Sequence, residues 1–112
     1  MKLITAVVTP PEFETIKKAL DIFGITGLTI TEVFQRDLTG ANHDQIYRGQ
    51  RFHVDLLPHI RIELVTANHD TTDILHIITK LTSPRGCAEN IWITPVETLT
   101  RVRTGERGTD AL

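Results

Sequence analysis

The sequence lacks the features of secreted, disulfide-bonded and membrane-spanning proteins. Its single cysteine, Cys87, excludes an internal disulfide framework and fits a reducing compartment. No apolar run approaches the roughly 18 residues that a membrane-spanning helix needs. A strand-like pattern begins directly at Met1–Thr5, so we expect no signal peptide. Together these absences predict a cytoplasmic protein without direct membrane insertion.

A basic excess, a metal motif and a catalytic constellation are also missing. The 12 basic and 14 acidic residues give a net charge of -2, so nucleic acid is not the expected partner. The five histidines form no H-x-x-x-H pattern and no Cys/His cluster. No pattern places two of the acidic residues Glu32, Asp55 and Glu63 together for acid–base catalysis. We expect no metal site, no required cofactor and no enzymatic activity.

The length and composition are those of one ordinary globular domain. A chain of 112 residues can bury its own core without disulfides or metal. Apolar residues make up 40% and charged residues 23%, which is typical of a soluble domain. Because the pattern shows no internal repeat and no low-complexity tract, we expect a single domain over residues 1–112.

The first third of the chain reads as strand, helix, strand. Leu3–Val8 is a short apolar run of the kind found in buried strands. After Pro11, which can occupy the first position of a helix, apolar residues recur at spacings of three and four: Phe13, Ile16, Leu20 and Phe23. Gly24 ends this helix. Ile25–Phe34 is rich in Ile, Thr and Val and predicts a second strand.

Residues 35–57 contain several glycines and polar side chains, and they show no sustained period. This pattern predicts a long loop. A loop of about 20 residues in a compact domain is uncommon and is usually functional.

The same order then returns. His59–Val65 alternates between apolar and polar residues, as a strand with one buried face does. A helical stripe follows, formed by Ile74, Ile77, Ile78 and Leu81. A loop at residues 83–90 leads into the strand Asn90–Val96, in which Pro95 indicates an edge of the sheet. In the C-terminal segment, residues 98–112, Leu99–Thr104 reads as a last extended piece.

Two strand–helix–strand units joined by a long loop predict the α+β class. The expected architecture is ferredoxin-like, βαββαβ, with an antiparallel sheet and both helices on one face. The other face of the sheet is expected to carry Thr29, Thr31, Arg61, Glu63 and Trp92. A tryptophan exposed there is unusual for a monomer, so we expect other copies of the chain to cover this face.

Arg101 and Arg103 lie two positions apart in the predicted extended piece. In an extended backbone, residues i and i+2 point the same way, about 7 Å apart. Two parallel guanidinium groups would form a clamp for phosphate or carboxylate oxygens. Two solvated arginines near the end of the sequence are the alternative interpretation, and the spacing alone does not decide between the two.

Several motifs resemble those of the PII signal-transduction proteins, which are trimeric regulators of nitrogen metabolism. The likeness extends along the chain through G-I-T-G-L-T-I-T-E-V at 24–33, Y-R-G at 47–49, V-D-L-L-P at 54–58, I-R-I-E-L-V at 60–65 and R-V-R-T-G-E at 101–106. The resemblance implies a homotrimer that holds an adenine nucleotide, ATP, ADP or AMP, between neighbouring subunits. It also implies that residues 35–57 dock on a partner, such as a membrane transporter, a metabolic enzyme or a regulatory protein.

The resemblance also assigns positions to the expected nucleotide site. Thr29, Glu63 and Val65 would lie around the adenine and ribose, and Arg101 and Arg103 would bind phosphates. The remaining expected nucleotide-binding residues belong to the loop 83–90, on the phosphate side: Gly86, Cys87 and Ala88.

The loop 83–90 departs from the family pattern T-G-x-x-G-D-G-K. Gly86 is its only glycine, Glu89 replaces a glycine, and Asn90 stands where the family has a lysine. Fewer amide groups can approach a phosphate, and a carboxylate repels it. These changes predict an altered nucleotide preference, with ADP, AMP or another small anion as acceptable as ATP. The alternative is a trimeric interaction module that has lost nucleotide binding.

The long loop departs from the family as well. The family's glutamine for magnesium–ATP and 2-oxoglutarate lies in a G-[FY]-G-R-Q-K-G motif that residues 35–40 do not contain. His59 replaces the lysine that would pair with a 2-oxoglutarate carboxylate, so classical 2-oxoglutarate sensing is not expected. Phe52 replaces the family's modified tyrosine and offers no hydroxyl group, so that modification is not expected either.

Overall fold

The computed structural model describes residues 1–25, 27–36, 44–47, 50–53, 56–82 and 90–112, without the side chains of 44–47 and 50–53. The elements in this part of the chain are β1 (Lys2–Val8), α1 (Pro10–Phe23), β2 (Thr29–Arg36), β3 (Asp44–Tyr47), β4 (Gln50–His53), β5 (Leu56–Thr66), α2 (Thr71–Leu81) and β6 (Ile91–Pro95). Two short 3-10 turns are η1 (Asn68–Asp70) and η2 (Gly108–Ala111). No helix among these is long and apolar enough to cross a membrane.

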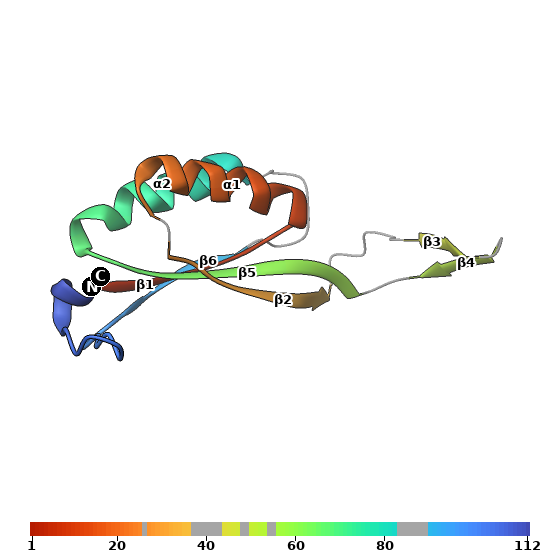
Figure 1. Cartoon of the computed structure of the whole chain (residues 1–112). Coiled ribbons are helices and arrows are strands. Elements are labelled where there is room, and N and C mark those ends of the chain that lie inside the picture. Colours follow the sequence, from red (N-terminus) through yellow and green to blue (C-terminus); the bar gives the residue numbers. More distant parts are fainter. Residues whose placement is uncertain (26, 37–43, 48–49, 54–55, 83–89) are drawn as a thin grey trace.

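Four strands form one antiparallel sheet in the order β2-β5-β1-β6. Both helices lie on the same face of this sheet (Figure 1). The predicted α+β class and the ferredoxin-like βαββαβ order are confirmed. The strand β6 lies at an edge, as Pro95 indicated.

The pairing register decides which side chains meet the helices. Thr5 of β1 lies opposite both Glu63 of β5 and Trp92 of β6, and Glu63 in turn lies opposite Thr29 of β2. Residues that are directly opposite share a face, and neighbours along a strand alternate. This row of four residues therefore lies on the face away from the helices, which we call the open face. Arg61 and Thr31 form the next polar pair of the open face, as expected from the sequence.

The helix-side face of the sheet forms the core with one stripe of each helix. These side chains are at most 3% exposed: Ile4, Ala6, Val8, Ile62 and Leu64 from the sheet, and Ile16, Leu20, Ile74 and Ile78 from the helices. Both helical pairs have a spacing of four residues, so each side chain lies one turn from the next on the same side of its helix. The buried apolar area is the main stabilising contribution to the sheet–helix arrangement.

Helix α1 ends where the sequence predicts, but β2 begins four residues later than expected. Gly24 adopts a left-handed φ of 110°, and its amide donates to the carbonyl oxygens of Leu20 and Asp21. The amide of Ile25 also donates to the Leu20 carbonyl oxygen, at 2.9 Å. Because this cap uses the amide of Ile25, the chain cannot pair with the sheet there, although its composition is that of a strand.

Parts of the predicted long loop at residues 35–57 have regular structure. The strand β2 continues to Arg36 and β5 begins at Leu56. Between them, β3 and β4 pair as a separate two-stranded antiparallel sheet, in which Gln45 lies opposite Phe52. Figure 1 shows this hairpin beyond the ends of β2 and β5. The remaining loop positions, 37–43, 48–49 and 54–55, lie outside the described residues.

Two isoleucines of α1 test the assignment of the core. Ile16 is fully buried, whereas Ile22 is 89% exposed. Ile16→Ala should lower the free energy of unfolding by about 2–5 kcal/mol, because it removes buried methyl groups and leaves a cavity. The matched change Ile22→Ala alters helix propensity equally and should stay within about 0.5 kcal/mol. Urea unfolding followed by circular dichroism at one protein concentration measures both, and equal losses would contradict this packing.

Candidate functional site

The open face carries a surface hollow of about 190 Å³ between β1, β2 and β5. We call it the Thr29 hollow. Its lining includes three residues that the sequence assigns to the nucleotide site, and the complete set is Leu3, Gly27, Thr29, Glu63, Leu64 and Val65. The structure therefore brings Thr29, Glu63 and Val65 together from two different strands.

The register gives this hollow one polar and one apolar part. Thr29 and Glu63 lie directly opposite each other, so a hydroxyl group and a carboxylate are neighbours across β2 and β5. Leu3 lies opposite Val65 on β1 and β5, one side-chain row away. Such a surface can contact a flat apolar ring on one side and accept hydrogen bonds from polar groups on the other.

Glu63 is paired with the arginine two residues before it on β5. The Nε atom of Arg61 lies 3.3 Å from Oε1 of Glu63, and the two side chains are 42% and 27% exposed. The geometry is that of an ion pair without hydrogen-bond alignment, since the Nε group has no hydrogen-bond partner among the described residues. The arginine thus balances the carboxylate charge beside the hollow without occupying its Oε1 with a hydrogen bond.

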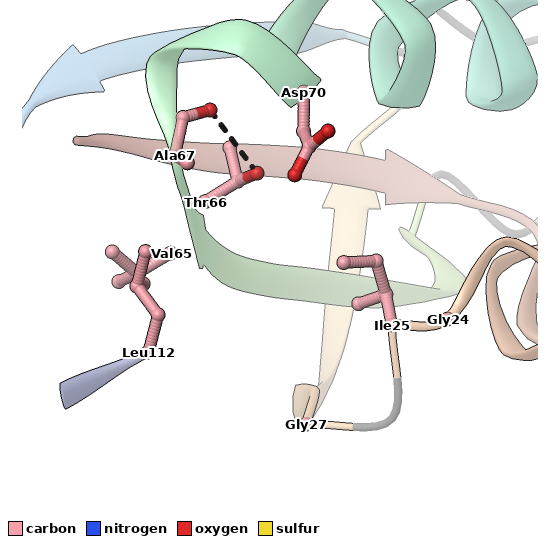
Figure 2. Close-up of a pocket in the computed structure, with 8 residues that line it drawn as sticks. All are labelled: Gly24, Ile25, Gly27, Val65, Thr66, Ala67, Asp70 and Leu112. Atoms are coloured by element: carbon pink, nitrogen blue, oxygen red, sulfur yellow. Dashed lines mark hydrogen bonds between the residues drawn. The ribbon is translucent and has the colours of Figure 1, made fainter. Parts of the chain in front are cut away.

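A second, larger hollow of about 320 Å³ adjoins the first, because Gly27 and Val65 line both. We call it the Leu112 hollow. Its lining comes from four separate segments and consists of Gly24, Ile25, Gly27, Val65, Thr66, Ala67, Asp70 and Leu112. Figure 2 shows the side chain of Leu112 beside Val65, with Ile25 and Asp70 farther along the lining.

The prediction that Leu99–Thr104 is extended is wrong, because residues 99–108 fold as a hairpin. Thr100 forms a bridge with Arg107, and the amide of Gly108 donates to the Leu99 carbonyl oxygen at 2.8 Å. The amide of Gly105 donates back to the Arg101 carbonyl oxygen at 2.7 Å. Gly105 has φ 78° and Gly108 has φ 66°, conformations that glycine adopts at little cost.

The two arginines of the motif consequently have different environments. Nη1 of Arg101 donates to Oε2 of Glu106 at 2.9 Å, and Nη2 lies 3.2 and 3.0 Å from the carbonyl oxygens of Ala111 and Leu112. Arg103 is exposed and makes no hydrogen bond or ion pair with the described residues. The two arginine side chains therefore do not form the parallel clamp that their spacing predicted.

The buried histidine at position 59 is shorter than the lysine that the resemblance places there, and it carries a ring in place of an ammonium group. His59 is only 2% exposed, and its Nδ1 lies 3.1 Å from the Leu57 carbonyl oxygen. A carbonyl oxygen only accepts, so Nδ1 carries the proton and donates. Its Nε2 atom is buried and has no partner among the described residues. The ring therefore offers no flexible ammonium group at the base of the long loop.

Sequence reasoning did not identify Leu3, Gly27 and Leu112 as residues near the site. Leu3 reaches the hollow only through the pairing of β1 with β5, and Leu112 only through the fold of the last residues. Gly27 belongs to the quoted G-I-T-G motif, which was the one available signal. The expected residues Gly86, Cys87 and Ala88 lie outside the described residues.

Comparisons with known proteins identify the family of this chain. The family described as "Nitrogen regulatory protein P-II" matches residues 1–106. Proteins named nitrogen regulatory protein P-II from Azospirillum brasilense and Cereibacter sphaeroides are each 36% identical to this chain, over 100% of both chains. Nitrogen regulatory protein GlnK from Escherichia coli strain K12 is 32% identical over the same shares. The match along the whole chain, together with the βαββαβ fold, shows that the chain belongs to the PII family of nitrogen regulatory proteins.

Proposed function

We propose that this PII-family regulator binds an adenine nucleotide at the boundary between subunits of a homotrimer and controls a partner through residues 35–57. The observation that carries the proposal is the convergence of Thr29, Glu63 and Val65 on one hollow. Thr29 lies 34 positions before Glu63 and 36 before Val65 in the chain, and only the pairing of β2 with β5 brings it to them. We place the protein in the cytoplasm, where adenine nucleotides are available.

The Thr29 hollow has the chemistry that an adenosine group requires. The side chains of Leu3 and Val65 offer apolar contact to an aromatic ring. The carboxylate of Glu63 can accept hydrogen bonds from an amino or ribose hydroxyl group, and the Thr29 hydroxyl can donate or accept. A nucleotide would thus be oriented by two polar groups on a mainly apolar surface.

The open face supports a site that a second subunit completes. Trp92 is 44% exposed and lies in the same row as Thr5, Glu63 and Thr29. An exposed tryptophan in a row that also lines the hollow is best accommodated when another copy covers this face. The shallow Thr29 hollow would then become a cleft with walls from two chains.

The nucleotide's phosphates are assigned to the arginines of the C-terminal hairpin, and Arg103 is the one with free donors. Its guanidinium group makes no hydrogen bond or ion pair with the described residues and can meet phosphate oxygens with paired N–H groups. ADP and AMP are included with ATP, because the loop 83–90 has a single glycine and a carboxylate at Glu89. No bound metal or cofactor is required for this role.

Control of a partner is assigned to residues 35–57, because their hairpin of β3 and β4 lies outside the main sheet. Candidate partners are a membrane transporter, a metabolic enzyme or another regulator of nitrogen use. A ligand can shift the loop only as far as its affinities for the two loop states differ. The alternative function is a trimeric interaction module without nucleotide binding, which the single glycine of the loop 83–90 favours.

Two arginines of one hairpin test nucleotide binding. Arg103→Ala should weaken ADP binding about 10-fold or more, because a charge-assisted contact to phosphate is lost. Arg107 is exposed in the same hairpin and outside the motif pair, so Arg107→Ala should leave the affinity within about 2-fold. Isothermal titration calorimetry with ATP, ADP and AMP measures each affinity.

The same titrations decide between the two functions. Binding by the wild-type chain and equal affinities of the Arg103→Ala and Arg107→Ala variants would remove Arg103 from the site. No binding of ATP, ADP or AMP at millimolar concentration would contradict the proposed function and support the interaction module.

Titration with 2-oxoglutarate tests the role of position 59. Because His59 is buried and offers no ammonium group, 2-oxoglutarate should change the affinity for magnesium–ATP by less than about 2-fold. The variant Phe34→Leu, at an exposed position of β2, serves as a control for nonspecific effects. A 2-oxoglutarate-dependent gain of about 10-fold or more in the wild type, by calorimetry, would show that the chain senses this acid without the lysine.

A further inference from the structure

Three oxygen atoms of the chain itself surround the guanidinium group of Arg101. They are Oε2 of Glu106 at 2.9 Å and the carbonyl oxygens of Ala111 at 3.2 Å and Leu112 at 3.0 Å. Acceptors at these distances are what a phosphate group would supply to the same side chain. The free chain therefore already satisfies much of the donor capacity that a nucleotide would use.

The contacts of Nη2 matter most for a phosphate. A guanidinium group binds an oxyanion in a two-pronged manner through Nη2 together with either Nη1 or Nε. Nη2 lies within hydrogen-bond distance of both Ala111 and Leu112. A two-pronged contact between Arg101 and phosphate thus requires at least one of these two oxygens to leave.

The residues that supply these oxygens form a compact unit, residues 108–112, which we call the final turn. The amide of Leu112 donates to the Thr109 carbonyl oxygen at 3.2 Å, and the amide of Gly108 donates to the Leu99 carbonyl oxygen. The left-handed φ of 66° at Gly108 turns the chain back toward the hairpin. The final turn is therefore attached to the hairpin at its start and to Arg101 at its end.

A second observation, independent of Arg101, places the final turn beside the candidate site. The side chain of Leu112 lines the Leu112 hollow next to Val65, and Val65 also lines the Thr29 hollow. Leu112 is 44% exposed, so its contact with the hollow is partial. The same residue thus supplies an oxygen to Arg101 and an apolar group to the wall of the adjoining hollow.

We propose that the final turn is an internal competitor of the nucleotide: it occupies Arg101 and the Leu112 hollow in the free protein and is displaced when a phosphate group binds Arg101. The inference rests on the proposed nucleotide binding and adds a form of regulation to it. Binding of a nucleoside phosphate then releases residues 108–112 from the hairpin. An adenosine without phosphate leaves the Arg101 contacts in place.

The effect on affinity is limited because the competing contacts are at the surface. The side chains of Arg101 and Glu106 are each 43% exposed, and hydrogen bonds at such positions contribute little. Removing the competitor should therefore tighten ADP binding by about 3- to 10-fold.

The first experiment compares ADP affinities by isothermal titration calorimetry. Deletion of residues 109–112, and separately Leu112→Ser in the full chain, should tighten ADP binding, the deletion by about 3- to 10-fold and the point variant by less. Thr109→Ala is the matched control within the final turn. Thr109 accepts a hydrogen bond from Leu112 with its main-chain oxygen, and its side chain makes no hydrogen bond with the described residues. This control should keep the wild-type affinity.

The second experiment follows the final turn itself in the wild-type chain. Hydrogen–deuterium exchange of a peptide covering residues 108–112 should rise when ADP is added and stay unchanged with adenosine. The difference between the two ligands isolates the phosphate, because both carry the same base and ribose.

The outcomes separate this inference from the proposed function. If the wild type binds ADP but the deletion leaves its affinity unchanged and the exchange of 108–112 does not rise, the competition is refuted and nucleotide binding stands. Binding by the deletion variant but not by the wild type would support the competition strongly. If neither binds ADP, nucleotide binding fails and this inference fails with it.

Discussion

The fold and the candidate site both depend on the register of the antiparallel pairing between β5 and its two neighbours, β1 and β2. That register directs Ile62 and Leu64 toward the helices and Glu63 toward the open face. Side chains alternate strictly along a strand, so a shift of β5 by one residue would place Glu63 in the apolar core and Ile62 in water. The large cost of burying an unpaired carboxylate opposes such a shift. The buried isoleucines on one face and the carboxylate of Glu63 on the other therefore favour the same alignment.

Most of the fold could be predicted from the sequence because its signals are periodic. The spacing of Ile16 and Leu20 and the alternation around Ile62 determine helix and strand locally. The start of β2 could not be predicted from composition. Residues from Ile25 onward have the composition of a strand, but the amide of Ile25 takes part in the cap of α1. The hairpin of β3 and β4 could not be predicted either, since its strands are only four residues long and mix polar with apolar residues. Such short strands have no periodic signal to detect.

Residues of the candidate site could be predicted only where they belong to a family motif. The resemblance to the PII family assigns Thr29 and Glu63 to one site, and the structure places them directly opposite each other on β2 and β5. The geometry of the arginines did not follow, because an R-x-R spacing implies parallel side chains only in an extended backbone. The left-handed glycine at 105 folds the motif into a hairpin instead, and Arg101 finds its acceptors ten and eleven residues later. Contacts between irregular segments leave no pattern in the sequence.

The ladder between β2 and β5 extends without interruption from Thr29–Glu63 to Arg36–Leu56. These seven steps span roughly 24 Å along the strands, from the hollow to the base of the long loop. Within the part of the chain that the structure describes, β2 is an edge strand of the main sheet, so β1 flanks this pair of strands on one side only. One continuous ladder therefore connects the hollow to the base of the long loop. A slip in its register at one end would displace the side chains at the other end as well.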